Sequence, residues 1–224
     1  MKKVYYTFVD LLRFFEMTSE MYVYSNPPKN YVKNPILIIP GLGSRWGGLK
    51  PLADFIAKSG YPVYVVKELG DNLFEIPYSA EIVKKVIEEN DLRNVILVGH
   101  SKGGLIGKYL MIHDDNDKRV LGMVSLATPY SGSRLANHLI IHRWKQFSTS
   151  DPMILELQED KSVNKRIISI SPAYDTAIWH KDKSNLEDSL ENITVSVSGH
   201  LNMVYKKELQ ETVEKSIEKI SALK

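Results

Sequence analysis

The sequence predicts a single α/β domain built on a mostly parallel, doubly wound sheet with helices on both faces. Short, fully apolar runs are typical of strands buried on both sides, and they alternate with segments whose apolar residues recur at helical spacing. A length of 224 residues suits one α/β domain with a full core. No internal repeat and no second domain is visible in the sequence. Together these observations favour the doubly wound class.

The composition excludes several classes of function. The chain has 29 basic and 27 acidic side chains, a net charge of +2 and no basic stripe, so we expect no nucleic-acid partner. It has no cysteine, which excludes disulfides, thiolate zinc sites and cysteine nucleophiles. The apolar N-terminal run is interrupted by charges and is followed by no cleavage site, and no long uncharged span occurs elsewhere. We therefore expect a cytoplasmic protein without a transmembrane helix.

The expected elements follow one another along the chain. We expect strands at 35–39, 61–66, 94–98, 120–127, 166–171 and 193–198. We expect helices at 3–20, 49–59, 80–90, 105–112 and from 202 onward. Ser79 is a candidate N-cap for the helix at 80–90, and Gly60 a C-cap for the preceding one. In this division, residues 1–30 form an N-terminal helical extension, and residues 31–224 form the α/β domain with a small cap or lid segment near 134–165.

The N-terminal segment has an apolar stripe at near-helical spacing. The favoured interpretation is a helix that packs against the body of the domain. A second interpretation is that residues 1–24 cover the active site or contact a lipid surface, although few lysines line the polar face. The stripe consists of Val4, Phe8, Leu11, Leu12 and Phe15, widened by Tyr5, Val9 and Phe14.

The most informative stretch is Gly99-His100-Ser101-Lys102-Gly103-Gly104, which joins an apolar strand to a helical segment. A serine between two glycines at a strand-to-helix turn is the pattern of a nucleophile elbow. The tight turn requires glycine at 99 and 103, and it holds the hydroxyl of Ser101 above the sheet near the positive end of the following helix. The competing interpretation is a glycine-rich turn with a capping serine. We predict that Ser101 is a catalytic nucleophile.

A serine nucleophile needs a base and an acid, each on a loop at the carboxyl end of a strand. His200 directly follows the last strand, and Asp175 follows the strand before it, so the chain order is serine, acid, histidine. We therefore predict that His200 is the base and Asp175 orients it. The other histidines and acids fit less well, because they lie within the elbow, on helix ends, in the lid or in a polar loop. These are His100, His113, His138, His142, His180, Asp151, Asp160, Asp182 and Asp188.

Two backbone N–H groups are needed to hold the developing oxyanion. Lys102, which follows the nucleophile, is one candidate, and we expect its side chain to face solvent. Leu42 is the other, because it lies in the glycine-rich loop after the first strand. His138 and His142 have metal-ligand spacing but no supporting third ligand, so we expect neither metal nor cofactor.

Taken together, these motifs resemble the α/β-hydrolase superfamily, and within it the compact lipases and esterases. The resemblance covers the chain from about residue 35 to the end. It implies hydrolysis of a carboxylic ester, or of a lipid substrate, through an acyl-enzyme without metal or cofactor. Pro40 stands where this family usually has a histidine, which removes one polar anchor of the oxyanion loop. The residues that carry the resemblance are 40–43, 98–104, 126–133, 171–175 and 199–201.

Several apolar side chains are candidates for the wall of an acyl pocket, although packing over the sheet would explain them equally well. These substrate-binding candidates are Trp46, Tyr130, Leu139 and Trp144. Two further interpretations stay open: transfer of the acyl group to an acceptor other than water, and a hydrolase-fold binding protein without turnover. The oligomeric state has no signal in the sequence.

Overall fold

The computed structural model describes residues 4–10, 32–138, 142–178 and 184–223. Within these residues six strands form one sheet in the order β2-β1-β3-β4-β5-β6, and every neighbouring pair is parallel. This arrangement confirms the predicted single α/β domain with a parallel sheet. The strands are β1 (Ile36–Ile39), β2 (Val63–Val65), β3 (Val95–His100), β4 (Val120–Leu126), β5 (Ile167–Tyr174) and β6 (Glu191–Ser198).

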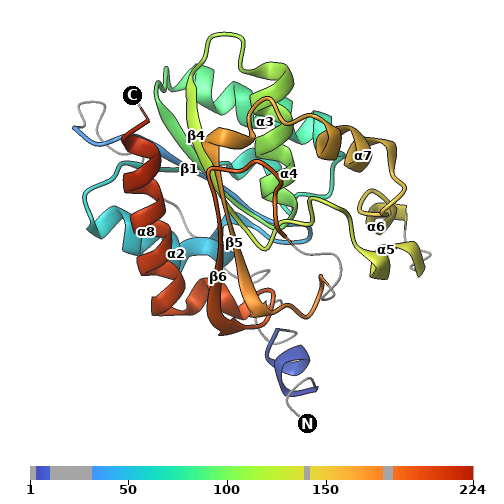
Figure 1. Ribbon diagram of the computed structural model, residues 1–224. Coiled ribbons are helices and arrows are strands. Elements are labelled where there is room, and N and C mark those ends of the chain that lie inside the picture. The colour runs from blue at the N-terminus through green and yellow to red at the C-terminus, as the bar shows by residue number, and fades with distance from the viewer. Residues whose placement is uncertain (1–3, 11–31, 139–141, 179–183, 224) are drawn as a thin grey trace.

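Helices cover both faces of the sheet, with α2 and α8 on one side and α3 and α4 on the other (Figure 1). The helices are α2 (Lys50–Lys58), α3 (Ile76–Glu89), α4 (Lys102–Tyr109), α5 (Arg134–His138), α6 (His142–Lys145), α7 (Pro152–Glu159) and α8 (Lys207–Ser221). Short helical turns also occur at η1 (Trp46–Leu49), η2 (Lys67–Leu69), η3 (Leu110–Asp114), η4 (Asn164–Arg166) and η5 (Asn202–Tyr205).

The strands bury both of their faces, which is why their sequences are almost continuously apolar. In β1, Leu37 and Ile39 pack into the cluster shared with α3 and α4, whereas Ile36 and Ile38 pack into the cluster under α2 and α8. All four side chains are fully buried. The two apolar cores therefore pack against opposite faces of the central strands and hold the loops at their carboxyl ends in place.

Some boundaries differ from those expected. Helix α3 begins at Ile76 because Glu75 is extended and Pro77 is accommodated in the first turn, so the expected N-cap role of Ser79 is wrong. Ser79 instead lies inside the helix, and its hydroxyl donates to the side-chain oxygen of Asn72 (3.3 Å). Strand β5 continues to Tyr174, three residues beyond its expected end, which places Asp175 directly after the strand.

The N-terminal helix, as we call residues 4–10, lies next to the loops that follow β5 and β6 (Figure 1). Val4, Tyr5 and Phe8 of the expected apolar stripe are exposed instead of packed inward, whereas Val9 is half-buried and Asp10 is buried. The exposed fractions of its large apolar residues are 74% for Val4, 63% for Tyr5 and 57% for Phe8. The rest of the expected stripe lies outside the described residues. Among the described helices, none combines the length and apolar character needed to cross a bilayer.

Candidate active site

Ser101 occupies the turn between β3 and α4, directly after the carboxyl end of β3. Its backbone is in a strained region, with φ 53° and ψ −117°, which costs a non-glycine residue about 1–3 kcal/mol. The N–H of Ser101 donates to the carbonyl of Leu126 (2.7 Å), and its own carbonyl accepts from Gly104 (3.1 Å). Backbone strain of this kind is concentrated at functional sites, so the conformation of Ser101 is consistent with a functional role.

Close packing of the elbow explains its glycines. A Cβ at position 99 would lie 2.6 Å from the backbone carbonyl of Gly103. A Cβ at position 103 would lie 2.2 Å from the carbonyl oxygen of Ile39 in β1. Both positions therefore need glycine, as expected, because the strand, the turn and the helix pack backbone against backbone.

The loop after β1 runs close to the elbow. A Cβ on Gly41 would lie 3.2 Å from the Cβ of Ser101, so the next residue, Leu42, is near the nucleophile position. The fully buried Asn72 donates from its side-chain nitrogen to the carbonyl of Pro40 (2.7 Å). Asn72 thus gives this loop a polar side-chain contact, which the apolar side chain of Pro40 cannot provide. Sequence reasoning missed Asn72, because no motif links it to a loop 32 residues away.

The side chain of Lys102 is fully buried, so the expectation that it faces solvent is wrong. Its Nζ donates to the backbone carbonyls of Asn72 (3.1 Å) and Phe74. Burial lowers the pKa of Lys102 to about 8, although Glu75 partly opposes the shift. The physical reason for the burial is that α4 packs against the loop before α3, whose carbonyls need donors.

His200 follows β6 and lies in hydrogen-bond contact with Asp175, which follows β5. The Nδ1 atom of His200 is 2.9 Å from Oδ2 and 3.1 Å from Oδ1 of Asp175. Oδ1 also accepts from the N–H groups of Ala177 and Ile178, both at 2.8 Å. Because the carboxylate faces Nδ1, the neutral ring carries its proton there, and Nε2 is left as a proton acceptor. This is the orientation that a general base requires.

The two partners shift each other's pKa in opposite directions. Burial opposes the charged form of Asp175, but the His200 ring and the N–H donors of Ala177 and Ile178 outweigh it, so the pKa of Asp175 lies below its ordinary value. Burial likewise disfavours the charged form of His200, but Asp175, with a contribution from Asp10, raises the pKa of His200 above 6.5. The Asp175 carboxylate therefore stabilises the protonated form of His200.

His100 supports His200 from the elbow. Its Nε2 lies 3.0 Å from the backbone carbonyl of His200, and burial, together with the charge of His200, lowers the pKa of His100 to about 3. His100 is therefore neutral, and it donates from Nε2 to that carbonyl. The structural role that we expected for His100 is consistent with these contacts.

One pocket of about 410 Å³ adjoins Ser101 and His200. The volume falls in the range of small-molecule sites. Trp144 contributes to its wall, whereas Trp46 and Tyr130 are buried outside it, and Leu139 lies outside the described residues. Its polar lining is Thr7, Asp10, Ser44, His100, Ser101, Ser133, Thr176 and His200. Its remaining lining is Gly41, Leu42, Pro129, Trp144, Phe147, Ala177, Ile178 and Leu201.

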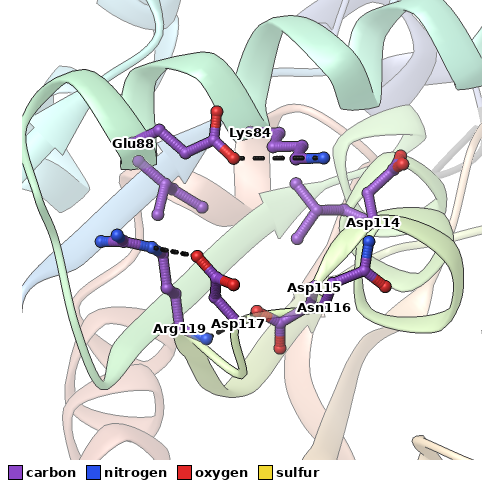
Figure 2. Close-up of a pocket in the computed structure, with 9 residues that line it drawn as sticks. Lys84, Glu88, Asp114, Asp115, Asn116, Asp117 and Arg119 are labelled. Atoms are coloured by element: carbon purple, nitrogen blue, oxygen red, sulfur yellow. Dashed lines mark hydrogen bonds and ion pairs between the residues drawn. The ribbon is translucent and has the colours of Figure 1, made fainter.

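A second, smaller pocket of about 150 Å³ lies beside the loop before β4, at the opposite edge of the sheet (Figure 2). Its charged side chains face one another, as in the ion pairs Lys84–Glu88 (4.0 Å) and Asp117–Arg119 (3.5 Å). The carboxylate of Asp115 accepts from the backbone N–H of Arg119 (2.7 Å). Internal partners therefore account for most of this charge, and no serine or threonine lines the pocket.

The described residues hold no cluster of three or more side chains suited to binding a metal ion. Of the other histidines, His113 of η3 pairs with Glu156 of α7 (2.9 Å). His180 lies outside the described residues.

The six-stranded parallel sheet, with helices on both faces and a sharp turn between β3 and α4, has the α/β-hydrolase fold. A family model for the PGAP1-like alpha/beta domain matches residues 74–220, about two thirds of the chain. The chain therefore belongs to the PGAP1-like α/β domain family.

Solved structures share this fold at low identity. The mature lipase BlEst2 of Bacillus licheniformis is 16% identical, with a TM-score of 0.63 over 86% of this chain and 94% of that one. Alpha/beta hydrolase domain-containing protein 10 from mouse is 17% identical, with a TM-score of 0.61 over 85% of this chain and 92% of that one. The metagenomic carboxyl esterase MGS0156 is 15% identical, with a TM-score of 0.62 over 92% of this chain and 78% of that one. Among curated proteins, none matches the sequence.

Proposed function

We propose that this protein is a serine hydrolase that cleaves carboxylic esters with an apolar acyl group. The observation that carries the proposal is the pocket that brings together the strained Ser101 and the Asp175-paired His200 beside an apolar wall. Fold relatives that include a lipase and a carboxyl esterase support the same chemistry. The chemistry needs no metal or cofactor.

In the proposed reaction, the hydroxyl oxygen of Ser101 attacks the ester carbonyl while Nε2 of His200 takes its proton. Asp175 holds the ring and stabilises the imidazolium. The backbone N–H groups of Leu42 and Lys102 hold the oxyanion, and one such donor lowers the barrier by about 3 kcal/mol. His200 then returns the proton to the departing alcohol, which leaves an acyl-Ser101 ester. A water molecule, deprotonated by His200, releases the carboxylic acid and restores Ser101.

The pocket also indicates the substrate class. Leu42, Phe147 and Ile178 line the same pocket as Ser101, and Trp144, which is 37% exposed, contributes to the same wall. An apolar acyl chain that covered these side chains would gain about 25 cal/mol of binding free energy per Å² of apolar surface removed from water.

The test compares the parent with Ser101→Ala on a series of p-nitrophenyl esters graded by acyl length. We expect turnover in the parent and a loss of at least about 10³-fold in Ser101→Ala. The matched control is Ser196→Ala, which removes the same hydroxyl from the exposed face of β6 and should leave turnover unchanged. Turnover in folded Ser101→Ala within tenfold of the parent would refute the proposal. Adding alcohol or amine acceptors to the same assay shows whether water is the preferred acceptor.

A further inference from the structure

The loop that carries His200 has backbone donors in an unusual arrangement. Gly199 turns the chain with φ +101°, and the N–H groups of residues 200, 201 and 202 then point toward one side. These donors lie at the start of the short turn η5, whose first residue is Asn202, so no helical carbonyl is available to accept from them. A buried N–H needs an acceptor, and one from elsewhere in the chain must supply it.

Asp10 of the N-terminal helix is that acceptor. Its Oδ2 accepts from the N–H of His200 (2.7 Å), and its Oδ1 accepts from the N–H groups of Leu201 (3.1 Å) and Asn202 (2.8 Å). The hydroxyl of Thr176, next to Asp175, also donates to Oδ2. Four donors therefore meet on one carboxylate that is only 8% exposed. Two carboxylate oxygens offer about four acceptor positions, so the group is saturated.

The surroundings of the Asp10 carboxylate are closely packed. A Cβ on Gly199 would lie 2.8 Å from Oδ1 of Asp10, so glycine makes room for it. His200 is held on its other side by His100, which donates to its carbonyl. The backbone of His200 is thus fixed at both its N–H and its carbonyl, while Asp175 fixes only the ring. Asp10 and Asp175 contact different parts of the same residue.

We propose that Asp10 is a positioning residue for His200, through which the N-terminal helix completes the active site. This inference rests on the proposed function, since it assigns Asp10 a role in placing the base of that reaction. Thr7 and Asp10 line the same pocket as Ser101, so the helix is also part of the pocket wall. Loss of the carboxylate leaves the N–H groups of Leu201 and Asn202 unpaired and leaves that of His200 only its longer contact with the hydroxyl of Thr176 (3.3 Å), which frees the loop to shift. A misplacement of about 1 Å lowers turnover by as much as about 100-fold.

The charge of Asp10 provides a second readout. The groups that face His200 are Asp175, Asp10 and the neutral His100, and both carboxylates favour the protonated ring. Removing the charge of Asp10 lowers the pKa of His200, so the acidic limb of kcat/KM moves to lower pH. A carboxylate whose charge did not act on His200 would leave this limb in place.

The experiment compares kcat, KM and pH profiles of Asp10→Asn and Asp10→Glu with the parent, using a p-nitrophenyl ester. We expect Asp10→Asn to lower kcat by about 10- to 100-fold, to leave KM within about threefold and to move the acidic limb to lower pH. Asp10→Glu restores the charge, so it should recover the position of the limb and part of kcat. Asp117→Asn is the matched control, because it removes one carboxylate charge at the opposite edge of the sheet.

Parent-like kcat and an unmoved acidic limb in folded Asp10→Asn would overturn the positioning role. The proposed function would be unaffected, because it depends on Ser101→Ala being inactive in the same assay. If Ser101→Ala is active, the proposed function itself fails. Should Asp10→Asn not fold, Thr176→Val carries the test, since it removes one donor from the Asp10 carboxylate and, with it, the second acceptor of the His200 N–H. A kcat lowered three- to tenfold at unchanged KM then supports the role, and a parent-like kcat overturns it.

Discussion

Replacing Asp175 by asparagine tests how the imidazole is oriented, and the structure fixes what asparagine would do. Oδ1 of Asp175 accepts from the N–H groups of Ala177 and Ile178, so the asparagine oxygen is held at that position. Its NH₂ group must then take the place of Oδ2, 2.9 Å from Nδ1 of His200. The opposite orientation would set a donor against two N–H groups. The substitution therefore presents a donor to Nδ1.

A donor facing Nδ1 favours the tautomer with its proton on Nε2, and that nitrogen can no longer accept the proton of Ser101. In serine proteases the same exchange lowers kcat by about 10⁴-fold, equivalent to about 5.4 kcal/mol of barrier. We expect a loss of that order for Asp175→Asn, measured as kcat on the best ester of the series. Loss of the charge should also lower the pKa of His200, which NMR titration can follow.

The matched control for this prediction is Asp188→Asn, in an exposed loop where the carboxylate pairs only weakly with Lys161 (3.8 Å). It should retain parent activity. Circular dichroism and thermal unfolding must show that Asp175→Asn is folded. A folded Asp175→Asn with kcat within tenfold of the parent would refute the assignment of Asp175 as the orienting acid, and it would leave a structural role for its contacts with the N–H groups.

The remaining predictions concern pH, the elbow and the buried lysine. Because the pKa of His200 is raised above 6.5 and the base must be neutral, kcat/KM should rise with pH with a midpoint above 6.5, and a midpoint below it would contradict the ion-pair geometry. Gly103→Ala should lower the free energy of unfolding by about 1–3 kcal/mol or more in denaturant titration, because its Cβ meets Ile39 at 2.2 Å; a change under about 0.5 kcal/mol would contradict the packing. Lys102→Met should keep kcat within about tenfold, because the backbone N–H is the working group, while unfolding becomes easier by about 1–3 kcal/mol as two carbonyls lose their donor. A kcat lower by 10³-fold in folded Lys102→Met would assign the ammonium a catalytic role.

The raised pKa of His200 also links pH to stability. A group whose pKa is higher in the folded state stabilises that state fully below its unfolded pKa, near 6.5, and this contribution is lost as pH rises through the folded pKa. Asp175 acts in the opposite direction: its lowered pKa stabilises the fold above its unfolded value, and the effect is lost on acidification.

Sequence reasoning was most effective where the chemistry is local. The elbow glycines, the apolar strands and the loop positions of Asp175 and His200 follow from spacing, since parallel strands end at one edge of the sheet. The boundary of α3 was less accessible, because Pro77 in the first helical turn overrides the capping signal at Ser79.

Side-chain environments that depend on distant segments could not be predicted. The burial of Lys102 requires the loop at 72–74 to present its carbonyls, and nothing near Lys102 in the sequence indicates this. Asp10 acts on a loop 190 residues later, although an acid that interrupts an otherwise apolar run was its one visible signal. Tyr130 lies among core side chains instead of at the pocket, because aromatic residues near a motif serve packing as readily as binding.

Covalent labelling with a fluorophosphonate, read by intact mass and peptide mapping, tests the central claim most directly. An activated serine attacks this reagent without requiring the natural ester to be known. We predict a single adduct on Ser101 in the folded parent, no adduct in Ser101→Ala and labelling at least about 100-fold slower in His200→Ala. A folded parent that takes up no reagent, or takes it up at another serine, would contradict the account.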